Sequence, residues 1–331
     1  MKTEILTLLR ETDGYVSGQE LCEKFGVSRT AVWKAINQLK EAGYEIEAVQ
    51  NKGYRLVSVP DILSESELQS VRKTRWIGEK IAFFDVVDST NTRAKQLAEE
   101  GAPNGTYVIA ERQDAGKGRR GRGFDSPAGQ GIWMTLVLKP EIDPNHASMI
   151  TLVTALAVSK AIADMTGRPA GIKWPNDIYW KDRKICGMLI ENTLVGRCIE
   201  NCIIGVGINI NQQTFCSDAP NPVSLRQITE KEQEPIFILA DTVKRFKDYY
   251  RKIQQGQTED IVRNYRERLY RHNGFHLYQD ADGVFEAEIH DVEPTGHLVL
   301  ADRDGTTRRY AFKEVSYLIP SDTSPSAPFV L

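Results

Sequence analysis

The most distinctive residues of this 331-residue sequence form one short segment rich in glycine and in cations. Residues 116–123 read Gly-Lys-Gly-Arg-Arg-Gly-Arg-Gly, so that four glycines are interspersed with four cationic side chains. Glycine lets backbone N–H groups approach a ligand closely, and the guanidinium group of arginine offers a rigid fork of donors that matches phosphate oxygens. This combination predicts a loop that closes over a polyanion.

Three interpretations of this loop compete. Gly116, Gly118 and Gly121 fit the G-x-G-x-x-G dinucleotide pattern, but that pattern requires a following helix. The next residues instead read as a turn and then as the apolar, β-rich run 132–138. A P-loop does not fit either, because Lys117 has no glycine in the required earlier position and no serine or threonine after it. A solvated basic loop, or an RGG-like contact to nucleic acid, remains the plainer alternative.

A second informative segment, residues 171–191, predicts three short strands joined by a Pro-Asn-Asp turn and by a charged turn. Lys184 opens the third of these strands, and Gly187 follows three residues later. We expect Lys184 to reach a ligand that lies on the sheet, while Gly187 leaves room for that ligand. The alternative is an ordinary surface lysine in a hairpin.

These segments occur together with further motifs, which are, in chain order, Asp88-Ser89-Thr90-Asn91, Glu111-Arg112-Gln113-Asp114-Ala115, the glycine-rich loop, Lys173-Trp174-Pro175-Asn176-Asp177, Asp182-Arg183-Lys184 and Ile204-Gly205-Val206-Gly207-Ile208-Asn209. In sequence and order they resemble the biotin protein ligase family, over about residues 80–320. The resemblance implies a central mixed α/β ligase domain, related to class II synthetase and lipoate ligase folds, and a C-terminal SH3-like β-barrel. Lys117 departs from the family loop, which usually has arginine there; the charge is kept but the forked donor is lost.

The resemblance also implies a reaction and the residues that carry it. Biotin and ATP with Mg²⁺ would form biotinyl-AMP, and biotin would pass to a lysine of a carboxylase carrier domain. Biotin binding is implied for Ser89, Thr90, Asn91, Gln113, Gly116, Lys117, Gly118, Arg119, Lys184, Gly187 and Gly205. Binding of ATP and the adenylate is implied for Arg119, Arg120, Arg122, Trp174, Asn176, Asp177, Lys184, Gly207 and Asn209. Lys184 and Arg119 are the implied catalytic residues, and no protein residue is assigned to a metal.

Two other classes of function stay open. One is a repressor that senses biotinyl-AMP without making it, which the presence of both Arg119 and Lys184 disfavours. The other is a lipoate-type ligase with a related fold. The arginine-rich loop and the leading segment of the chain favour biotin over lipoate.

That leading segment, residues 1–60, predicts a three-helix unit. Ile5, Leu8 and Leu9 mark the apolar face of a first helix, and a capping box that begins at Ser17 starts a second helix, which Gly26 ends. Such a unit is typical of a helix-turn-helix domain, although plain helical scaffolds share it. The resemblance adds a parallel, since the bifunctional branch of the family carries a helix-turn-helix in front of the ligase.

The third helix and the residues after it predict a recognition helix and a wing. Ser28 is its N-cap, and the apolar residues at 32, 36 and 39 face the core. Residues 44–49 and 53–57 alternate as two strands around a basic tip. The expected DNA contacts are Ser28, Arg29, Thr30, Lys34, Asn51, Lys52 and Arg55. Their small excess of positive charge suits one half-site of operator DNA bound by a homodimer. The resemblance implies that the adenylate promotes this homodimer by ordering the glycine-rich loop.

The remaining sequence predicts a multidomain α+β protein. Strands are expected at 81–87, 107–110, 275–278, 284–292, 297–301 and 306–311, and helices at about 90–100, 147–166, 235–253 and 259–270. The resemblance implies that a loop at 212–222 helps to cover the adenylate. The predicted domains are 1–60, 61–272 and 273–320, followed by a disordered tail at 321–331.

Composition and net charge limit the cellular compartments and the modes of DNA binding that this sequence fits. A net charge of −3 argues against steering of nucleic acid by the whole molecule, so DNA binding must be local. Five cysteines at irregular spacing indicate reduced thiols of a cytoplasmic protein, and Cys198 and Cys202 read as core thiols rather than as zinc ligands. No apolar run approaches the length of about 18 residues that a membrane span needs, so no membrane partner is expected.

Overall fold

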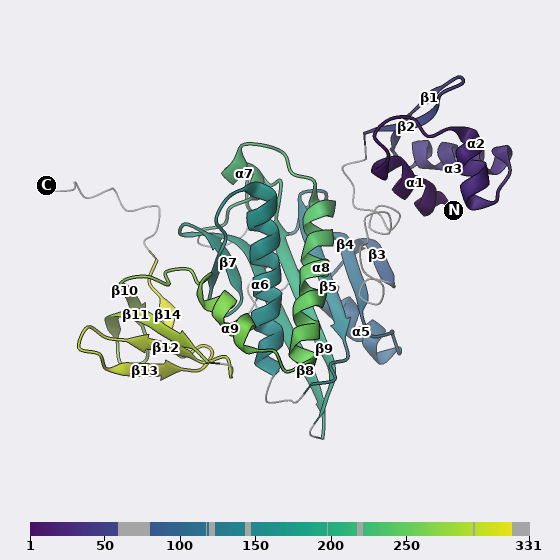
Figure 1. Cartoon of the computed structure of the whole chain (residues 1–331). Helices are drawn as coiled ribbons and strands as arrows, with labels where there is room; N and C mark the ends of the chain where they lie inside the picture. The colour runs from purple at the N-terminus through teal and green to yellow at the C-terminus, as the bar shows by residue number, and fades with distance from the viewer. Residues whose placement is uncertain are drawn as a thin grey trace, which may run out of the picture. The chain divides into compact units, whose positions relative to one another are not determined.

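The computed structural model describes residues 1–58, 80–116, 118, 123–142, 147–196, 198–216, 221–293 and 295–319. Contacts divide the chain into two compact units, Met1–Lys73 and Thr74–Leu331. Each unit has its own core and is described by itself. Figure 1 shows the three helices of the first unit and the large sheet with its helices in the second.

The first unit consists of three helices and a hairpin: α1 (Lys2–Glu11), α2 (Gly18–Phe25), α3 (Arg29–Glu41), β1 (Glu45–Val49) and β2 (Gly53–Ser58). The predicted N-caps are confirmed, because the hydroxyls of Ser17 and Ser28 accept hydrogen bonds from the N–H groups of Glu20 (3.0 Å) and Ala31 (3.2 Å). Gly26 ends α2 with φ 64°, a conformation that favours glycine. The core contains the predicted residues Ile5, Leu9, Val32, Ile36 and Leu39.

The second unit is built on a seven-stranded sheet with the order β3-β4-β5-β9-β8-β7-β6. Its strands are β3 (Ile81–Val87), β4 (Thr106–Gln113), β5 (Gly131–Leu138), β6 (Gly171–Lys173), β7 (Asp177–Trp180), β8 (Arg183–Val195) and β9 (Cys198–Asn209). Only the β3–β4 pair is parallel among the pairs described in this sheet. The predicted strands are confirmed, and the pairing sets Thr135 opposite Gly205 and Gly187 opposite Gly207.

Both faces of this sheet are covered, and the two covers differ. Successive residues of a strand point to opposite faces, so Met134 and Leu136 lie on one face, and Trp133 and Thr135 on the other. Helices α6 (Ala147–Thr166) and α8 (Pro235–Gln254) lie side by side over the first face (Figure 1). Helix α5 (Thr90–Glu99) packs on the second face, in a cluster of Ala94, Ala98, Val108, Val137 and Ile203.

Helix α6 is the apolar centre of the unit. By length and composition it is the one helix within the described residues that could cross a membrane, but 67% of its most apolar window is buried inside the fold. Burial on nearly every side explains why its sequence lacks an amphipathic pattern. It is the predicted core helix, and Gly167 follows its end with φ 63°.

Two details in the C-terminal half correct or extend the prediction. The helix expected at 259–270 is α9 (Glu259–Arg266), which stops early because residues 268–270 pair with β6 instead: the Ile172 N–H donates to the Arg268 carbonyl (2.7 Å), and the Tyr270 N–H donates to the Ile172 carbonyl (2.8 Å). A short helix that the sequence analysis missed, α7 (Leu225–Thr229), begins with a capping box at Ser224.

The C-terminal strands form a five-stranded antiparallel sheet with the order β13-β12-β11-β10-β14. They are β10 (His276–Gln279), β11 (Val284–Val292), β12 (Leu298–Ala301), β13 (Thr307–Tyr310) and β14 (Ser316–Tyr317), and the last was not predicted. The register of β11 shifts between Ile289 and Asp291, where a bulge bends the strand.

The positions of the cysteines agree only partly with the prediction. All five thiols are free, and Cys202 is buried as predicted, but Cys198 is exposed at the start of β9, so its assignment to the core is wrong. The pairing of Cys198 with Val195 places it at the turn of a long hairpin, where few residues can cover it.

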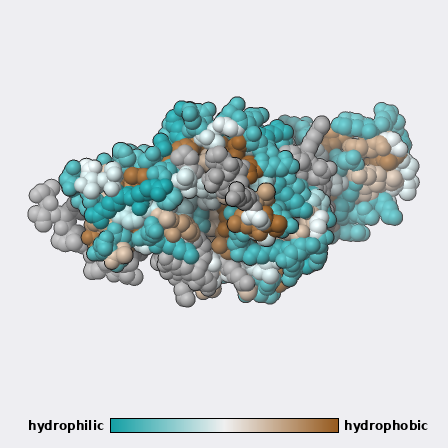
Figure 2. Space-filling view, turned by 90° about the horizontal axis from the view of Figure 1, so that it is seen from below, coloured by the Kyte–Doolittle hydropathy of each residue, from teal (hydrophilic) through white to brown (hydrophobic). Residues whose placement is uncertain are grey.

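On the face drawn in Figure 2, hydrophilic residues form most of the coloured surface.

Candidate functional site

Polar side chains at the N-terminus of α5 form a hydrogen-bonded network with β4 and β5. The Oε1 atom of Gln113 accepts hydrogen bonds from the Thr90 backbone N–H (2.8 Å) and from the Thr90 hydroxyl (3.0 Å). The Thr135 hydroxyl lies 2.9 Å from Thr90 Oγ1 and 2.8 Å from Asn91 Oδ1, and its single proton serves one of them at a time. The predicted biotin-site residues Thr90, Asn91 and Gln113 are thus brought together.

The N-terminus of α5 is capped from a neighbouring strand. Ser89 occupies the N-cap position and is 3% exposed, but its side chain makes no cap hydrogen bond. The Gln113 side chain satisfies the N–H of Thr90 from a neighbouring strand. The cap is therefore supplied by tertiary structure rather than by residues 88–91.

Asn91 explains a glycine in β9. A Cβ atom on Gly205 would lie 2.0 Å from Asn91 Oδ1, so only glycine fits opposite this amide. The Asn91 amide also donates to the Leu189 carbonyl (3.2 Å) and to Glu191 Oε2 (3.0 Å). Glu191 in turn pairs with Lys95 at 2.6 Å. The space that Gly205 leaves is filled by a site residue.

Lys184 lies over the neighbouring strands, as its place at the start of β8 predicts. Its Nζ atom forms an ion pair with Asp177 Oδ1 at 2.8 Å, and both side chains are about a quarter exposed (26% and 23%). A Cβ on Gly187 would lie 3.0 Å from Lys184 Nζ, so the lysine stem crosses the glycine. Burial raises the pKa of the Cys186 thiol well above its ordinary value, so this thiol stays protonated.

Phe124 joins the glycine-rich loop to this sheet surface. A Cβ on Gly207 would lie 2.7 Å from the Phe124 ring, and the ring also packs edge-on against Trp133 with centroids 5.7 Å apart. The Phe124 N–H donates to the Gly116 carbonyl at 2.9 Å, which closes the base of the loop. Phe124 had no role in the sequence prediction. Its signal was its position directly after the loop.

Two buried asparagines hold the backbone around Lys184. Asn176 is 5% exposed, and its amide donates to the Met188 carbonyl. Asn209 is 5% exposed and donates weakly to the Lys184 carbonyl at 3.4 Å, while its Oδ1 accepts from Gln212 (3.1 Å). Both predicted residues lie within the scaffold that positions Lys184.

Trp174 contacts the C-terminal sheet. It is 4% exposed, its indole N–H donates to the Gly296 carbonyl (2.9 Å), and its ring packs edge-on against Phe312 with centroids 6.0 Å apart. The next residue, Pro175, accepts a hydrogen bond from the Tyr265 hydroxyl at 3.1 Å. Contacts with α9 and with the C-terminal sheet therefore hold the turn that carries Asp177 in place.

Four predicted loop residues lie outside the described ranges: Lys117, Arg119, Arg120 and Arg122. Gly118 is described and half-buried, and Gly116 is buried. A Cβ on Gly116 would lie 2.5 Å from the Phe124 carbonyl oxygen and 2.9 Å from Ser126 Oγ. This glycine is required by the closed base of the loop.

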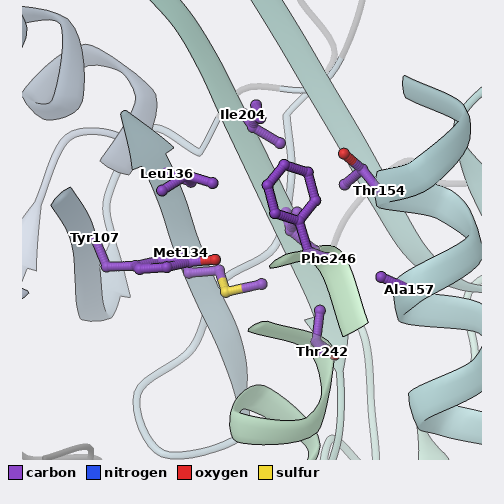
Figure 3. Close-up of a pocket in the computed structure, with 9 residues that line it drawn as sticks. Tyr107, Met134, Leu136, Thr154, Ala157, Ile204, Thr242 and Phe246 are labelled. Carbon is purple, nitrogen blue, oxygen red and sulfur yellow. The ribbon is translucent and has the colours of Figure 1, made fainter. Parts of the chain in front are cut away.

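An internal cavity lies on the opposite face of the sheet and does not belong to this site. It is lined by Tyr107, Met134, Leu136, Thr154, Ala157, Ile204, Val206, Thr242 and Phe246, from the sheet, α6 and α8 (Figure 3). It has room for about one water molecule. The buried Thr242 hydroxyl has no hydrogen-bond partner among the described residues, so a single water there would satisfy it.

In the first unit, the predicted DNA contacts divide into outward and tethered residues. Thr30 and Lys34 are exposed on α3. The orientation of Arg29 is restricted, because its guanidinium donates a hydrogen bond to Gln19 Oε1 (3.0 Å). Arg55 is tethered more firmly: it pairs with Glu47 at 2.7 Å and lies over the Tyr15 ring, 5.1 Å from its centroid.

The base of the wing is therefore held by a charged cluster. The Tyr15 hydroxyl donates to Glu47 (2.7 Å), and this hydrogen bond together with Arg55 holds the pKa of Glu47 below its ordinary value. Lys52, at the tip, lies 5.7 Å from the Tyr15 ring centroid. Asn51 has φ 65°, as the tight turn between the strands requires.

Two family models match the chain. The model described as the biotin/lipoate A/B protein ligase family matches residues 83–209, and a model described as an HTH domain matches residues 2–55. The first match spans β3 to the end of β9 and includes the network around Asn91, the glycine-rich loop and Lys184. The second covers the three helices and most of the wing.

Curated proteins and solved structures give the same picture. The chain is 35% identical to the bifunctional ligase/repressor BirA of Bacillus spizizenii over 313 residues, which cover 90% of this chain and 92% of the relative. It is 33% identical over 194 residues to BirA of Escherichia coli, covering 59% of each. A biotin protein ligase from Aquifex aeolicus, solved with biotin and ATP, superposes with a TM-score of 0.62 and 26% identity, covering 72% of this chain and 98% of that one. The chain therefore belongs to the biotin/lipoate A/B protein ligase family, and within it to the bifunctional ligase/repressors with an N-terminal helix-turn-helix domain.

Proposed function

We propose that this protein is an ATP-dependent biotin protein ligase and a biotin-responsive transcriptional repressor. The observation that carries the ligase function is the arrangement on one face of the sheet. The Thr90–Asn91–Gln113 network, the closed base of the glycine-rich loop and the Lys184–Asp177 pair all meet there. The N-terminal unit supplies the repressor function, as in the relatives named bifunctional ligase/repressor.

The first step activates the carboxylate of biotin. A carboxylate oxygen attacks the α-phosphorus of ATP and forms a mixed anhydride. The bond between the α-phosphorus and the oxygen that bridges to the β-phosphate breaks, and pyrophosphate leaves with that oxygen and the electron pair. The ammonium of Lys184 neutralises charge on the carboxylate and the α-phosphate as they approach. Asp177 holds that ammonium in place beforehand, so positioning rather than a general base lowers the barrier.

Biotin and the nucleotide occupy different parts of the site. The ureido group of biotin has both donors and an acceptor, which suit the polar groups of Ser89, Thr90, Asn91 and Gln113. The biotin set extends to Gly116, Lys117, Gly118, Arg119, Lys184, Gly187 and Gly205. The nucleotide and adenylate set consists of Arg119, Arg120, Arg122, Trp174, Asn176, Asp177, Lys184, Gly207 and Asn209, with Trp174 acting as a support behind the turn.

Magnesium enters this scheme with the nucleotide. Mg²⁺ is commonly bound by one or two carboxylates together with substrate phosphates and water, not by a cage of protein ligands. Asp177 is the carboxylate nearest to Lys184 that could contribute to such binding.

In the second step, the amine of a lysine on the carrier domain of a biotin-dependent carboxylase attacks the mixed anhydride. An amide bond forms, the bond to phosphate breaks, and AMP leaves. Arg119, Arg120 and Arg122 retain the adenylate until the acceptor arrives, since guanidinium groups match phosphate oxygens. The loop at 212–222 helps to cover the same intermediate.

For the repressor, we propose a cytoplasmic homodimer that forms when the adenylate is bound and that binds a two-fold operator through its helix-turn-helix units. The domain limits that go with this function are 1–60, 61–272 and 273–320. The bulge in β11 supports the proposal that the C-terminal sheet is an SH3-like barrel.

The deciding experiment is the intact mass of a biotin-acceptor domain after incubation with the protein, biotin and Mg-ATP. We expect a gain of one biotin that requires ATP. Lys184→Ala should slow this gain at least about 100-fold, whereas Lys181→Ala, in the exposed turn before β8, should not. A gain with lipoate but not with biotin would support a lipoate-type ligase, and no gain with either would support the non-catalytic sensor.

A further inference from the structure

The recognition helix α3 carries one large aromatic side chain on its outside. Trp33 is 59% exposed, and no other aromatic residue in the described ranges of the chain is as exposed. The tryptophan side chain combines a large apolar ring with an N–H donor, so at this position it offers contact area to whatever the recognition helix binds. The sequence prediction for DNA contacts did not include it.

Helix geometry places Trp33 on the exposed side of α3, next to the edge of its buried face. The buried side of α3 carries Val32, Ala35, Ile36 and Leu39. Thr30 and Asn37 lie three residues before and four residues after Trp33, so they share its face. Lys34 is its exposed neighbour. The face thus presents a flat apolar ring flanked by hydrogen-bond donors and a cation.

The residues around Trp33 favour DNA over a second protein as its binding partner. Arg29, Lys34 and Lys40 are exposed along α3, against Glu41 at its end. A stable protein interface needs about 800 Å² from each partner, and one tryptophan supplies at most about 250 Å². An isolated ring among cations and polar groups does not form such a patch. A helix that enters the major groove of DNA meets phosphates at the edges and bases in the centre.

We propose that Trp33 is a specificity-determining residue of the repressor, whose ring packs against the 5-methyl group of a thymine in the major groove of the operator. This rests on the proposed repressor function. The thymine methyl is the apolar mark that distinguishes thymine in that groove, and an apolar side chain is the group that reads it. Thr30, Lys34 and Asn37 would then contact the flanking base edges and phosphates.

The test begins with a duplex selected from random sequences by the unaltered protein with biotin and Mg-ATP. Dissociation constants are measured for that duplex and for a random-sequence duplex of the same length. Trp33→Ala should weaken binding to the selected duplex about 5- to 150-fold and to the random duplex less than about twofold. Lys34→Ala, at the exposed neighbour on the same helix, is the control, and it should weaken both duplexes alike.

A second measurement asks which base is read. Thymines of the selected duplex are replaced one at a time by deoxyuridine, which lacks only the methyl group. One replacement should weaken binding of the unaltered protein and leave binding of Trp33→Ala unchanged. Thermal unfolding by circular dichroism checks that the variant is folded.

The outcomes separate the two proposals. If no sequence is preferred by the unaltered protein, the repressor function is wrong and this inference fails with it. If a duplex is preferred but Trp33→Ala binds it equally well, or loses affinity for both duplexes alike, only the role of Trp33 is wrong. A change in oligomeric state of Trp33→Ala would also overturn it, because Trp33 would then be covered by protein.

Discussion

Single atoms decide how the residues of the site fit together. Asn91 fits against Gly205 only because glycine has no Cβ, which would lie 2.0 Å from the Asn91 amide oxygen. Phe124 fits against Gly207 for the same reason, because a Cβ there would lie 2.7 Å from the Phe124 ring. The absent side chains thus leave room for protein groups, which in turn form the surface toward a ligand. This differs from the expectation that Gly187 leaves room for the ligand itself.

Thr135 offers the sharpest test at this scale. It is fully buried, and its hydroxyl is shared between Thr90 and Asn91. Thr135→Val keeps the shape but leaves the Asn91 oxygen without this donor, so we expect the free energy of unfolding to fall by about 1–3 kcal/mol. Biotin affinity, measured by isothermal titration calorimetry, should fall as well.

Thr135→Ser is the matched control, because it removes a methyl group and keeps the hydroxyl. It should retain most of the affinity for biotin. Equal affinities for the valine and serine variants would mean that the hydroxyl does not organise the network.

At the scale of elements, the C-terminal sheet stabilises the turn that positions Asp177, through Trp174 and Gly296. The Gly296 turn is itself held by Glu293, whose carboxylate accepts hydrogen bonds from Arg309 (2.7 Å) and Thr295 (2.9 Å). Arg309 and Thr295 lower the pKa of Glu293 from its ordinary value of 4.5 to about 2. This turn therefore depends on an ionised carboxylate.

The lowered pKa of Glu293 makes the stability of the fold depend on pH. A carboxylate whose pKa is lower in the folded state stabilises the fold above its unfolded pKa, and this contribution is lost as the pH falls from about 4.5 to about 2. We expect the midpoint of urea unfolding, followed by tryptophan fluorescence, to fall over this range. Glu293→Gln should lower the midpoint at pH 7 and reduce its pH dependence.

Other carboxylates titrate in the same range, so a comparison is needed. Glu288→Gln removes one carboxylate from β11 in the same sheet. If both variants showed the same pH dependence, the Glu293 cluster would not be the cause.

At the scale of the whole molecule, the two functions require communication between the ligase unit and a symmetric DNA complex. Phe124 and Gly116 fix the base of the glycine-rich loop, and the cationic residues between them meet the adenylate in our proposal. A glycine-rich segment loses much conformational entropy when it is ordered. A ligand that orders it can therefore complete a surface for a second copy of the chain.

Sedimentation equilibrium tests this link. The protein alone should sediment near its monomer mass of 37.3 kDa, and biotin with Mg-ATP should shift the average mass toward twice that value. Biotin with an ATP analogue that cannot react at the α-phosphate is the control and should not cause the shift. The same mass under all three conditions would contradict dimerisation driven by the adenylate.

Local sequence patterns suffice to predict most elements of the fold and the chemical class of the site. Caps at Ser17 and Ser28, the apolar periods of the first unit and most strands follow from local patterns, because these depend on residues a few positions apart. The motifs around Asn91, residues 116–123 and Lys184 carried the family resemblance, which the comparisons confirm.

The contacts between residues far apart in the chain become visible only in the folded protein. Thr135, the one hydroxyl in the apolar run 132–138, joins the site because β5 lies beneath α5, and Gln113 caps that helix from β4. Phe124 covers the glycines of β8 and β9 for the same reason. Helix α9 ends early because β6 takes up the hydrogen bonds of residues 268–270. Each of these contacts joins segments far apart in the chain, and a local pattern contains no information about which distant partner will compete for a hydrogen bond or fill a space.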